Sequence, residues 1–256
     1  MVQTAIQLHT LRDIDESLPD LLSRVGETNF DGVELYDSQF DALRDDAVRE
    51  RTREALDATG LVVAGAHVGV ERIERDTEFL VETCRTLGCS RVVVPTYDGD
   101  AFTDRAGIEG VADHLSELAD AVEGLELLYH NHTFEFGDID GTVAFEVFVD
   151  AADDRFGFEP DVGLATHAGY DALTLLDVVG NRAPIAHLTD SNPDDPDAVH
   201  ADPGTGVIDL EAAAEAAVQN GAEWLVCENG RSKDPQTTLA RGSEVFESLR
   251  EHVESQ

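Results

Sequence analysis

Eight short runs of apolar and β-branched residues recur along the chain, and the segments between them carry apolar residues at helical spacing. The starts of the runs lie roughly 30 to 40 residues apart, which is about the length of one strand followed by one helix. We therefore predict eight strands, at residues 4–8, 32–35, 62–66, 91–94, 125–130, 156–158, 185–188 and 224–227.

Two of the intervening segments show the helical pattern most clearly. In one, apolar residues follow each other in steps of three and four, as on the buried face of an amphipathic helix: Ile108, Val111, Leu115, Leu118 and Val122. In the other the same steps join Ile73, Thr77, Leu80, Cys84 and Leu87. Gly88 follows directly, and we predict that it ends this second helix.

Eight strands alternating with eight helices over 256 residues predict an α/β fold, a single (β/α)8 TIM barrel formed by one domain over residues 1–256. A doubly wound open sheet is the alternative, but no GxGxxG motif follows the first predicted strand. Residues 191–206, rich in Asp and Pro, form the one long insertion, after the seventh strand.

Charge narrows the classes of function. The chain holds 54 Asp and Glu against 17 Lys and Arg, a net charge of −37, which argues against a partner that presents a nucleic-acid backbone. It has no apolar run long enough to span a membrane and no signal-peptide pattern, and its three cysteines form no CxxC pair. We therefore expect a soluble cytoplasmic protein. Lys233 is the only lysine, and this composition favours a halophilic protein that works in molar salt.

Polar residues stand at the ends of the last four predicted strands. His130 and His132 end the fifth strand, and Asp161, His187 and Glu228 end the next three. The active site of a (β/α)8 barrel lies at these strand ends, and carboxylates with imidazoles bind divalent metals. The sequence therefore predicts a metal site with open positions for a substrate.

The same residues carry a family resemblance over nearly the whole chain. The motifs lie, in order, at residues 7–13 (QLHTLRD), 30–35 (FDGVEL), 129–136 (YHNHTFEF), Asp161 with 168–171 (AGYD), 187–190 (HLTD), 203–209 (PGTGVID) and 224–228 (WLVCE). In these the chain resembles the xylose isomerase-like, sugar phosphate isomerase/epimerase family of (β/α)8 barrels. Two positions depart from the family pattern, Thr189 where relatives often have Lys and Leu164 where they often have His or an aromatic residue.

The resemblance implies site residues. It makes Glu135, Asp161, His187 and Glu228 the metal ligands, and Glu135 and Glu228 the catalytic pair that moves a proton. Some relatives place the ligand at the strand end itself, where this chain has His130, so His130 or His132 could join the metal or bind substrate. His67 and Glu34, which end the third and second strands, are further candidates for substrate binding.

The resemblance also implies the reaction. A divalent cation, Mn²⁺ or Mg²⁺ with Zn²⁺ or Co²⁺ as alternatives, would bind adjacent oxygens of a small sugar and stabilise an enediolate. We therefore expect an enzyme, a sugar or sugar-phosphate isomerase or epimerase. The alternatives are a keto-sugar or keto-inositol lyase or dehydratase, an abasic-site endonuclease, and a barrel that binds sugar without catalysis. The sequence leaves a homo-oligomer open.

Overall fold

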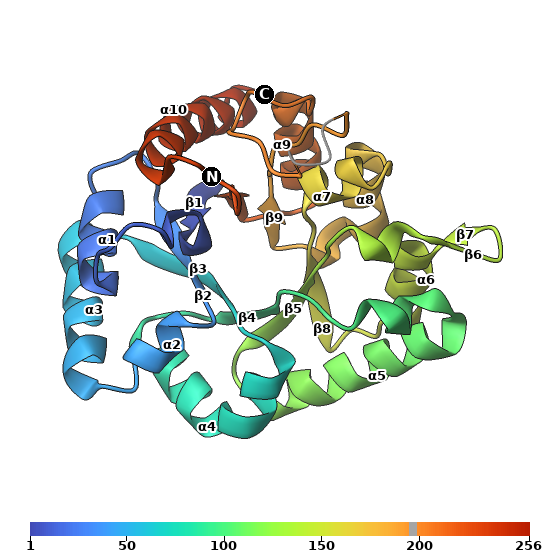
Figure 1. The fold of residues 1–256 in the computed structure, drawn as a ribbon, viewed down its shortest axis with the longest axis horizontal. Coiled ribbons are helices and arrows are strands. Elements are labelled where there is room, and N and C mark those ends of the chain that lie inside the picture. The colour runs from blue at the N-terminus through green and yellow to red at the C-terminus, as the bar shows by residue number, and fades with distance from the viewer. Residues whose placement is uncertain (195–198) are drawn as a thin grey trace.

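The carboxyl ends of eight parallel strands meet at one end of a barrel in the computed structural model, which describes residues 1–194 and 199–256 (Figure 1). The strands are β1 Gln3–Gln7, β2 Gly32–Tyr36, β3 Val62–His67, β4 Arg91–Val94, β5 Glu126–His130, β8 Phe156–Glu159, β9 Ile185–His187 and β10 Trp224–Cys227. The predicted (β/α)8 barrel is thereby confirmed, and the open-sheet alternative is excluded.

The barrel has one weak join. The hydrogen-bonded order of the strands is β8-β5-β4-β3-β2-β1-β10-β9. Between the two ends of this order, an isolated parallel bridge joins Asp161 to His187, and the His187 N–H donates to the Pro160 carbonyl at 2.9 Å. The sheet is therefore nearly closed, and its join lies at two of the predicted ligands.

Helices ring the sheet on its outer side (Figure 1). The longer ones are α1 Leu18–Val25, α3 Asp46–Thr59, α4 Val70–Thr86, α5 Arg105–Ala121, α6 Ala144–Ala151, α8 Ala172–Val179, α9 Leu210–Gln219 and α10 Pro235–Glu254. The predicted helical patterns correspond to α5 and α4, and Gly88 has the left-handed φ of 71° that suits a helix end. None of the described helices is long and apolar enough to cross a membrane.

The remaining elements are short. They are the helices α2 Gln39–Ala42 and α7 Val162–His167, the 3₁₀ turns η1 Leu8–Leu11, η2 Gly99–Thr103, η3 Phe134–Phe136 and η4 Gly180–Arg182, and the hairpin of β6 Asp138–Ile139 with β7 Thr142–Val143. Figure 1 shows the hairpin projecting beyond the ring of helices. Part of the predicted long loop, residues 195–198, lies outside the described residues.

The interior of the barrel explains where the polar residues face. A separate apolar cluster fills it, made of Ala5, Ala64, Val93, Leu128, Ile185, Trp224 and Val226. Side chains alternate along a strand, so a residue two positions further on faces the same side. His130 follows Leu128 in this way, His187 follows Ile185, and Glu228 follows Val226. A layer of polar side chains therefore covers the apolar interior cluster at the carboxyl end of the barrel.

Candidate metal centre

A cavity of about 580 Å³ opens at the carboxyl end of the barrel. We call it the mouth cavity. Residues at or after the ends of all eight barrel strands line it, and six of the nine histidines of the chain are among them: His9, His67, His130, His132, His167 and His200. Since (β/α)8 barrels carry their active sites at this end, the mouth cavity is the natural place for chemistry.

Two overlapping groups of buried possible ligands lie at the floor of the cavity, and three of their members, His67, His130 and Glu228, also line it. The outer group consists of His130, Asp161, His187 and Glu228, and the inner group consists of His67, His130, Glu159 and His187. Within each group, one atom from every residue lies within 4.8 Å of the others. His130 and His187 belong to both groups, and each offers one ring nitrogen to either side.

The outer group fits a divalent cation. His187 Nδ1 lies 3.3 Å from Glu228 Oε2 and 3.9 Å from Asp161 Oδ2, and His130 Nε2 lies 4.0 Å from the same Asp161 oxygen. His187 Nδ1 is buried and has no hydrogen-bond partner among the described residues. Two carboxylates and two imidazoles around an unpartnered nitrogen are a donor set for Mn²⁺, Zn²⁺ or a similar ion.

In the inner group, the histidine nitrogens already make hydrogen bonds to the buried carboxylates of Glu34 and Glu159. His187 Nε2 lies 2.8 Å from Glu34 Oε2, and His130 Nδ1 lies 3.1 Å from Glu159 Oε2. His67 Nε2 joins the two carboxylates, at 2.6 Å from Glu159 Oε2 and 3.2 Å from Glu34 Oε2. The inner carboxylates therefore satisfy the nitrogens that face away from the outer group.

The buried carboxylates and histidines of the two groups shift one another's pKa values. Burial by itself would lower the pKa of His187, but the carboxylates of Glu159 and Glu34 outweigh it and hold that pKa well above its ordinary value. The same balance, burial against Glu34 and Glu159, raises the pKa of His67 to about 10. Burial would raise the pKa of Glu228, yet its contact with His187 holds it well below the ordinary value. A cation in the outer group would thus replace a proton on His187.

The sequence itself now places the chain in a family. Residues 22–249 match the sequence profile described as the xylose isomerase-like TIM barrel. The chain belongs to the xylose isomerase-like TIM barrel family. A search of curated protein sequences found no match.

Solved structures share the fold of this xylose isomerase-like barrel at low sequence identity. A sugar phosphate isomerase/epimerase from Parabacteroides distasonis has a TM-score of 0.74 and 17% identity, over 97% of this chain and 94% of that one. The 3-keto-D-glucoside 4-epimerase of E. coli has a TM-score of 0.71 and 18% identity, over 98% and 100%. The IOLI protein, solved with a bound zinc atom, has a TM-score of 0.71 and 18% identity, over 99% of both chains. These likenesses establish the fold.

The barrel brings together three of the four ligands that the family resemblance implies. Asp161, His187 and Glu228 meet in the outer group, and His130 is its fourth member. His67 and His132, which the sequence analysis predicts to bind substrate, line the mouth cavity. Glu34 is fully buried and is not among the lining residues, so it lies below the space that a substrate would enter.

Glu135 lies elsewhere. Its carboxylate accepts hydrogen bonds from Tyr129 Oη at 2.7 Å and from the His132 N–H at 3.0 Å, and it is not part of either ligand group. The Tyr129 side chain packs in the apolar core between the strands and the outer helices, whereas the side chain of its neighbour His130 faces the barrel axis. Because β5 ends at His130 and the chain turns into η3, Glu135 is carried to the outer side, and His130 stands where the sequence placed Glu135.

Sequence reasoning missed Glu159. It is fully buried at the end of β8 and contacts three histidines of the inner group. A signal for it was present, since Glu159 stands two positions before Asp161 and two after Gly157, so strand alternation turns all three to the barrel axis.

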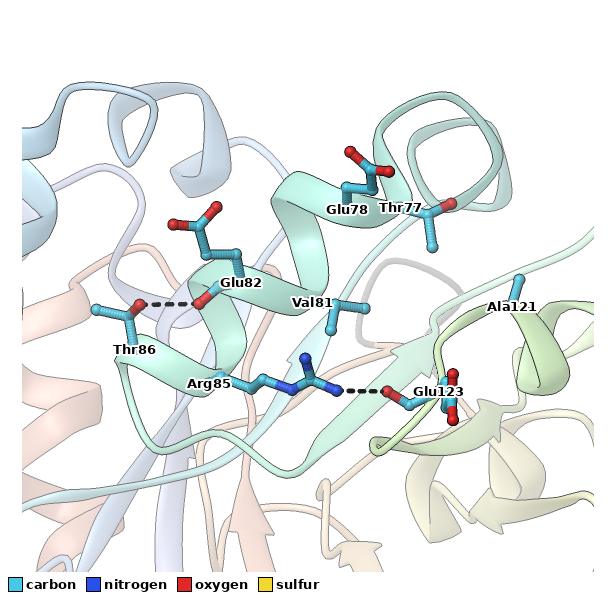
Figure 2. Close-up of a pocket in the computed structure, with 8 residues that line it drawn as sticks. All are labelled: Thr77, Glu78, Val81, Glu82, Arg85, Thr86, Ala121 and Glu123. Carbon is cyan, nitrogen blue, oxygen red and sulfur yellow. Dashed lines mark hydrogen bonds between the residues drawn. The ribbon is translucent and has the colours of Figure 1, made fainter.

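Another cavity, of about 530 Å³, lies between α4 and α5 on the outside of the barrel (Figure 2). Arg85, one of its lining residues, donates to the Glu123 carbonyl at 2.8 Å, and no histidine lines it. It lies along the second half of α4 and at the end of α5, the helix ends that return to the amino ends of the strands. We assign it no part in the chemistry of the site.

Proposed function

We propose that this chain is a divalent-metal-dependent isomerase or epimerase that acts on a sugar or sugar derivative. The observation that carries the proposal is the convergence of His130, Asp161, His187 and Glu228 below a cavity at the carboxyl end of the barrel. The likeness to sugar isomerases and epimerases supports the choice of reaction. The mouth cavity, about 580 Å³, falls within the usual range of sites for small molecules.

A divalent cation bound by the outer group would polarise a carbonyl oxygen of the substrate and acidify the neighbouring C–H. Glu228 is the one carboxylate of this group that also lines the mouth cavity. Its low pKa keeps it ionised at neutral pH, so it is available to accept that proton. We therefore assign Glu228 the role of the base.

The proton must also be returned, and two imidazoles, those of His67 and His132, also line the cavity. His67 ends β3 and His132 follows β5, and each strand is three places away from β10 around the barrel. The high pKa of His67, about 10, where the carboxylates of Glu34 and Glu159 overcome the effect of burial, keeps it protonated, so it would be the group that gives a proton back to the substrate carbon. A carboxylate and an imidazole would thus serve where the sequence suggested two carboxylates.

The central test compares two variants. Glu228→Gln keeps the size of the side chain but removes the charge, so turnover of a keto-sugar should fall by about 10²–10⁴-fold, as for a lost general base. His187→Ala should act mainly through the metal, and added Mn²⁺ should restore part of its activity. Added Mn²⁺ should leave the Glu228 variant inactive, because occupancy does not supply a base.

Glu109→Gln, an exposed change on α5, is the matched control and should behave like the unaltered protein. Metal content and initial rates are measured on all three variants. Near-normal turnover by Glu228→Gln would refute its role in proton transfer. Product analysis by NMR then decides the class of reaction: loss of a substituent from the sugar, instead of a rearranged or inverted one, would contradict the isomerase proposal in favour of a lyase.

A further inference from the structure

We infer that Glu34 and Glu159 are positioning residues that fix which nitrogen of His187 and of His130 is free to bind the cation. This rests on the proposed metal in the outer group. A neutral imidazole has one N–H and one lone pair, so the hydrogen bond of one nitrogen decides the role of the other. Glu34 faces His187 Nε2 at 2.8 Å, and Glu159 faces His130 Nδ1 at 3.1 Å.

The two assignments follow from the acceptors. With its proton on Nε2, directed at Glu34, His187 presents the lone pair of Nδ1 to Asp161 and Glu228. With its proton on Nδ1, directed at Glu159, His130 presents the lone pair of Nε2 to Asp161. The two ligand histidines should therefore bind the cation through different ring nitrogens, Nδ1 in His187 and Nε2 in His130.

Glu34 is itself held as an acceptor. The Gln7 side chain accepts the His9 N–H through Oε1 at 3.0 Å, which turns its Nε2 toward Glu34 Oε2 at 2.9 Å. Gly65 leaves room for the carboxylate, because a Cβ there would lie 2.7 Å from Glu34 Oε1. Glu34 thus receives N–H groups from both sides and is fixed before any ligand binds.

The same count of lone pairs argues against the inner group as the metal site. A cation there would need the lone pairs of His187 Nε2 and His130 Nδ1, and both rings would have to reverse their tautomers. The His187 proton would then lie on Nδ1, whose nearest acceptor is Glu228 Oε2 at 3.3 Å, and Nε2 would give up the shorter contact with Glu34 at 2.8 Å. The arrangement of acceptors therefore favours the outer group.

Nitrogen NMR of the Zn²⁺-loaded protein tests the assignment without any variant. We expect the His187 ring to show a protonated Nε2 and a zinc-bound Nδ1, and the His130 ring the reverse. A His187 ring that binds zinc through Nε2 would overturn the inference and place the ion in the inner group. A protein that binds no divalent cation would instead refute the proposed function.

Glu34→Gln provides the second measurement. Weakening the acceptor should lower Zn²⁺ affinity by 10–100-fold in calorimetry, as for other residues that orient metal-binding histidines. Glu146→Gln is the control, since Glu146 is half-buried in α6, bonds Tyr170 Oη at 2.7 Å and is in neither ligand group. Unchanged affinity in a folded Glu34→Gln protein would show that the carboxylate only fills space.

A different observation carries a second inference, which concerns the size of the substrate. A side cavity of about 460 Å³ adjoins the mouth cavity. Asp37 lines both, and Pro95 of the mouth cavity is followed directly by Thr96 of the side cavity. The Asp37 carboxylate is fixed between them, by the Gly69 N–H at 3.0 Å and by Arg72 at 2.8 Å. The two cavities therefore lie side by side beyond the ends of β2, β3 and β4, with the Asp37 side chain shared between them.

We propose that the side cavity binds the second ring of a glycoside whose first ring lies over the metal; this too rests on the proposed function. Its lining combines an aromatic ring, Tyr97, with hydrogen-bonding groups of both kinds, among them Thr96, Asp98 and Arg75. The Tyr97 ring is held by its hydroxyl group, 2.6 Å from His114 Nδ1. A fixed aromatic surface beside polar groups suits a hydroxylated ring, which has an apolar face and a polar rim.

The test uses a hexose with a ketone at a carbon other than C1, which stays free in a glycoside, offered as its methyl glycoside and as a disaccharide. We expect a kcat/KM at least tenfold higher for the disaccharide than for the methyl glycoside, and Tyr97→Ala should remove this advantage. Equal kcat/KM for both substrates in the unaltered protein would overturn the inference and leave the proposed function standing. Turnover of neither substrate would count against the proposed function itself.

Discussion

At the scale of single residues, Glu135 shows how surroundings set the behaviour of a carboxyl group. It is fully buried beside Tyr129, and burial outweighs its three hydrogen-bond contacts and raises its pKa to about 7. An unfolded chain would titrate this group near the ordinary value of 4.5. Between these two values the folded protein holds the proton that the unfolded chain has released.

The folded state is therefore stabilised by this group at low pH, and the stabilisation is lost as the pH rises through about 7. Glu135→Gln, which imitates the protonated form, should remove this loss. Its free energy of unfolding should fall less than that of the unaltered protein between about pH 5 and about pH 8, by up to about 3 kcal/mol. Urea unfolding at both pH values measures it, and an unchanged pH dependence would contradict the assignment.

The site could be predicted in part for a physical reason. Alternation along a regular strand fixes which side a residue faces, so the sequence predicts that His187, which ends β9, and Glu228, which follows β10, face the barrel axis; in the structure both lie in the outer group. Past the end of β5 alternation no longer fixes the direction of a side chain, and the Glu135 side chain points away from the barrel axis, toward Tyr129. The hydrogen bond that joins Glu34 to His187 spans 153 residues of the sequence, and no local pattern predicts such a contact.

At the scale of elements, α7 shows how closely a helix approaches the barrel. Asp161 begins it by accepting the Leu164 N–H at 2.8 Å, and its other oxygen accepts the Thr189 hydroxyl at 2.6 Å. Gly163 permits this approach, because a Cβ there would lie 2.4 Å from the Thr189 carbonyl. The strands and long helices were predictable from their periodicity, whereas short elements such as α7 and the β6–β7 hairpin hold too few residues for a repeat.

Two glycine substitutions separate these effects. Gly163→Ala should destabilise the protein by about 1–3 kcal/mol, since α7 must move away from the segment after β9. Gly110→Ala, on the exposed face of α5 with no atom within 4 Å of the new Cβ, should stabilise it by about 0.5–1 kcal/mol. Thermal unfolding of both variants measures the difference. Equal shifts would mean that helix propensity alone decides both.

At the scale of the whole molecule, charge dominates. Much of the small basic complement is already paired, for example Arg53 with Glu50 and Asp57, and Arg155 with Asp153 and Asp120. Exposed pairs of this kind contribute about 1 kcal/mol or less each. With 54 acidic residues against 17 basic ones, the remaining carboxylates repel one another over the surface.

We predict that the melting temperature rises with salt. At about 0.1 M the screening length is about 10 Å and repulsion between carboxylates persists, whereas at molar concentrations it is about 3 Å. Circular dichroism from about 0.1 M to about 3 M KCl measures the effect. Salt also weakens the exposed ion pairs, so a flat or falling melting temperature would mean that those pairs outweigh the repulsion, and would refute halophilic adaptation.

The join between β8 and β9 gives the ring of strands a preferred place to open. The bridge there is made by Asp161 and His187, which are also two of the four proposed ligands. A cation bound to both would hold the two edges together where the sheet itself holds them least. Backbone hydrogens at the join would then exchange with solvent more slowly as the site fills, and loss of the ion would loosen the barrel locally before it unfolds as a whole.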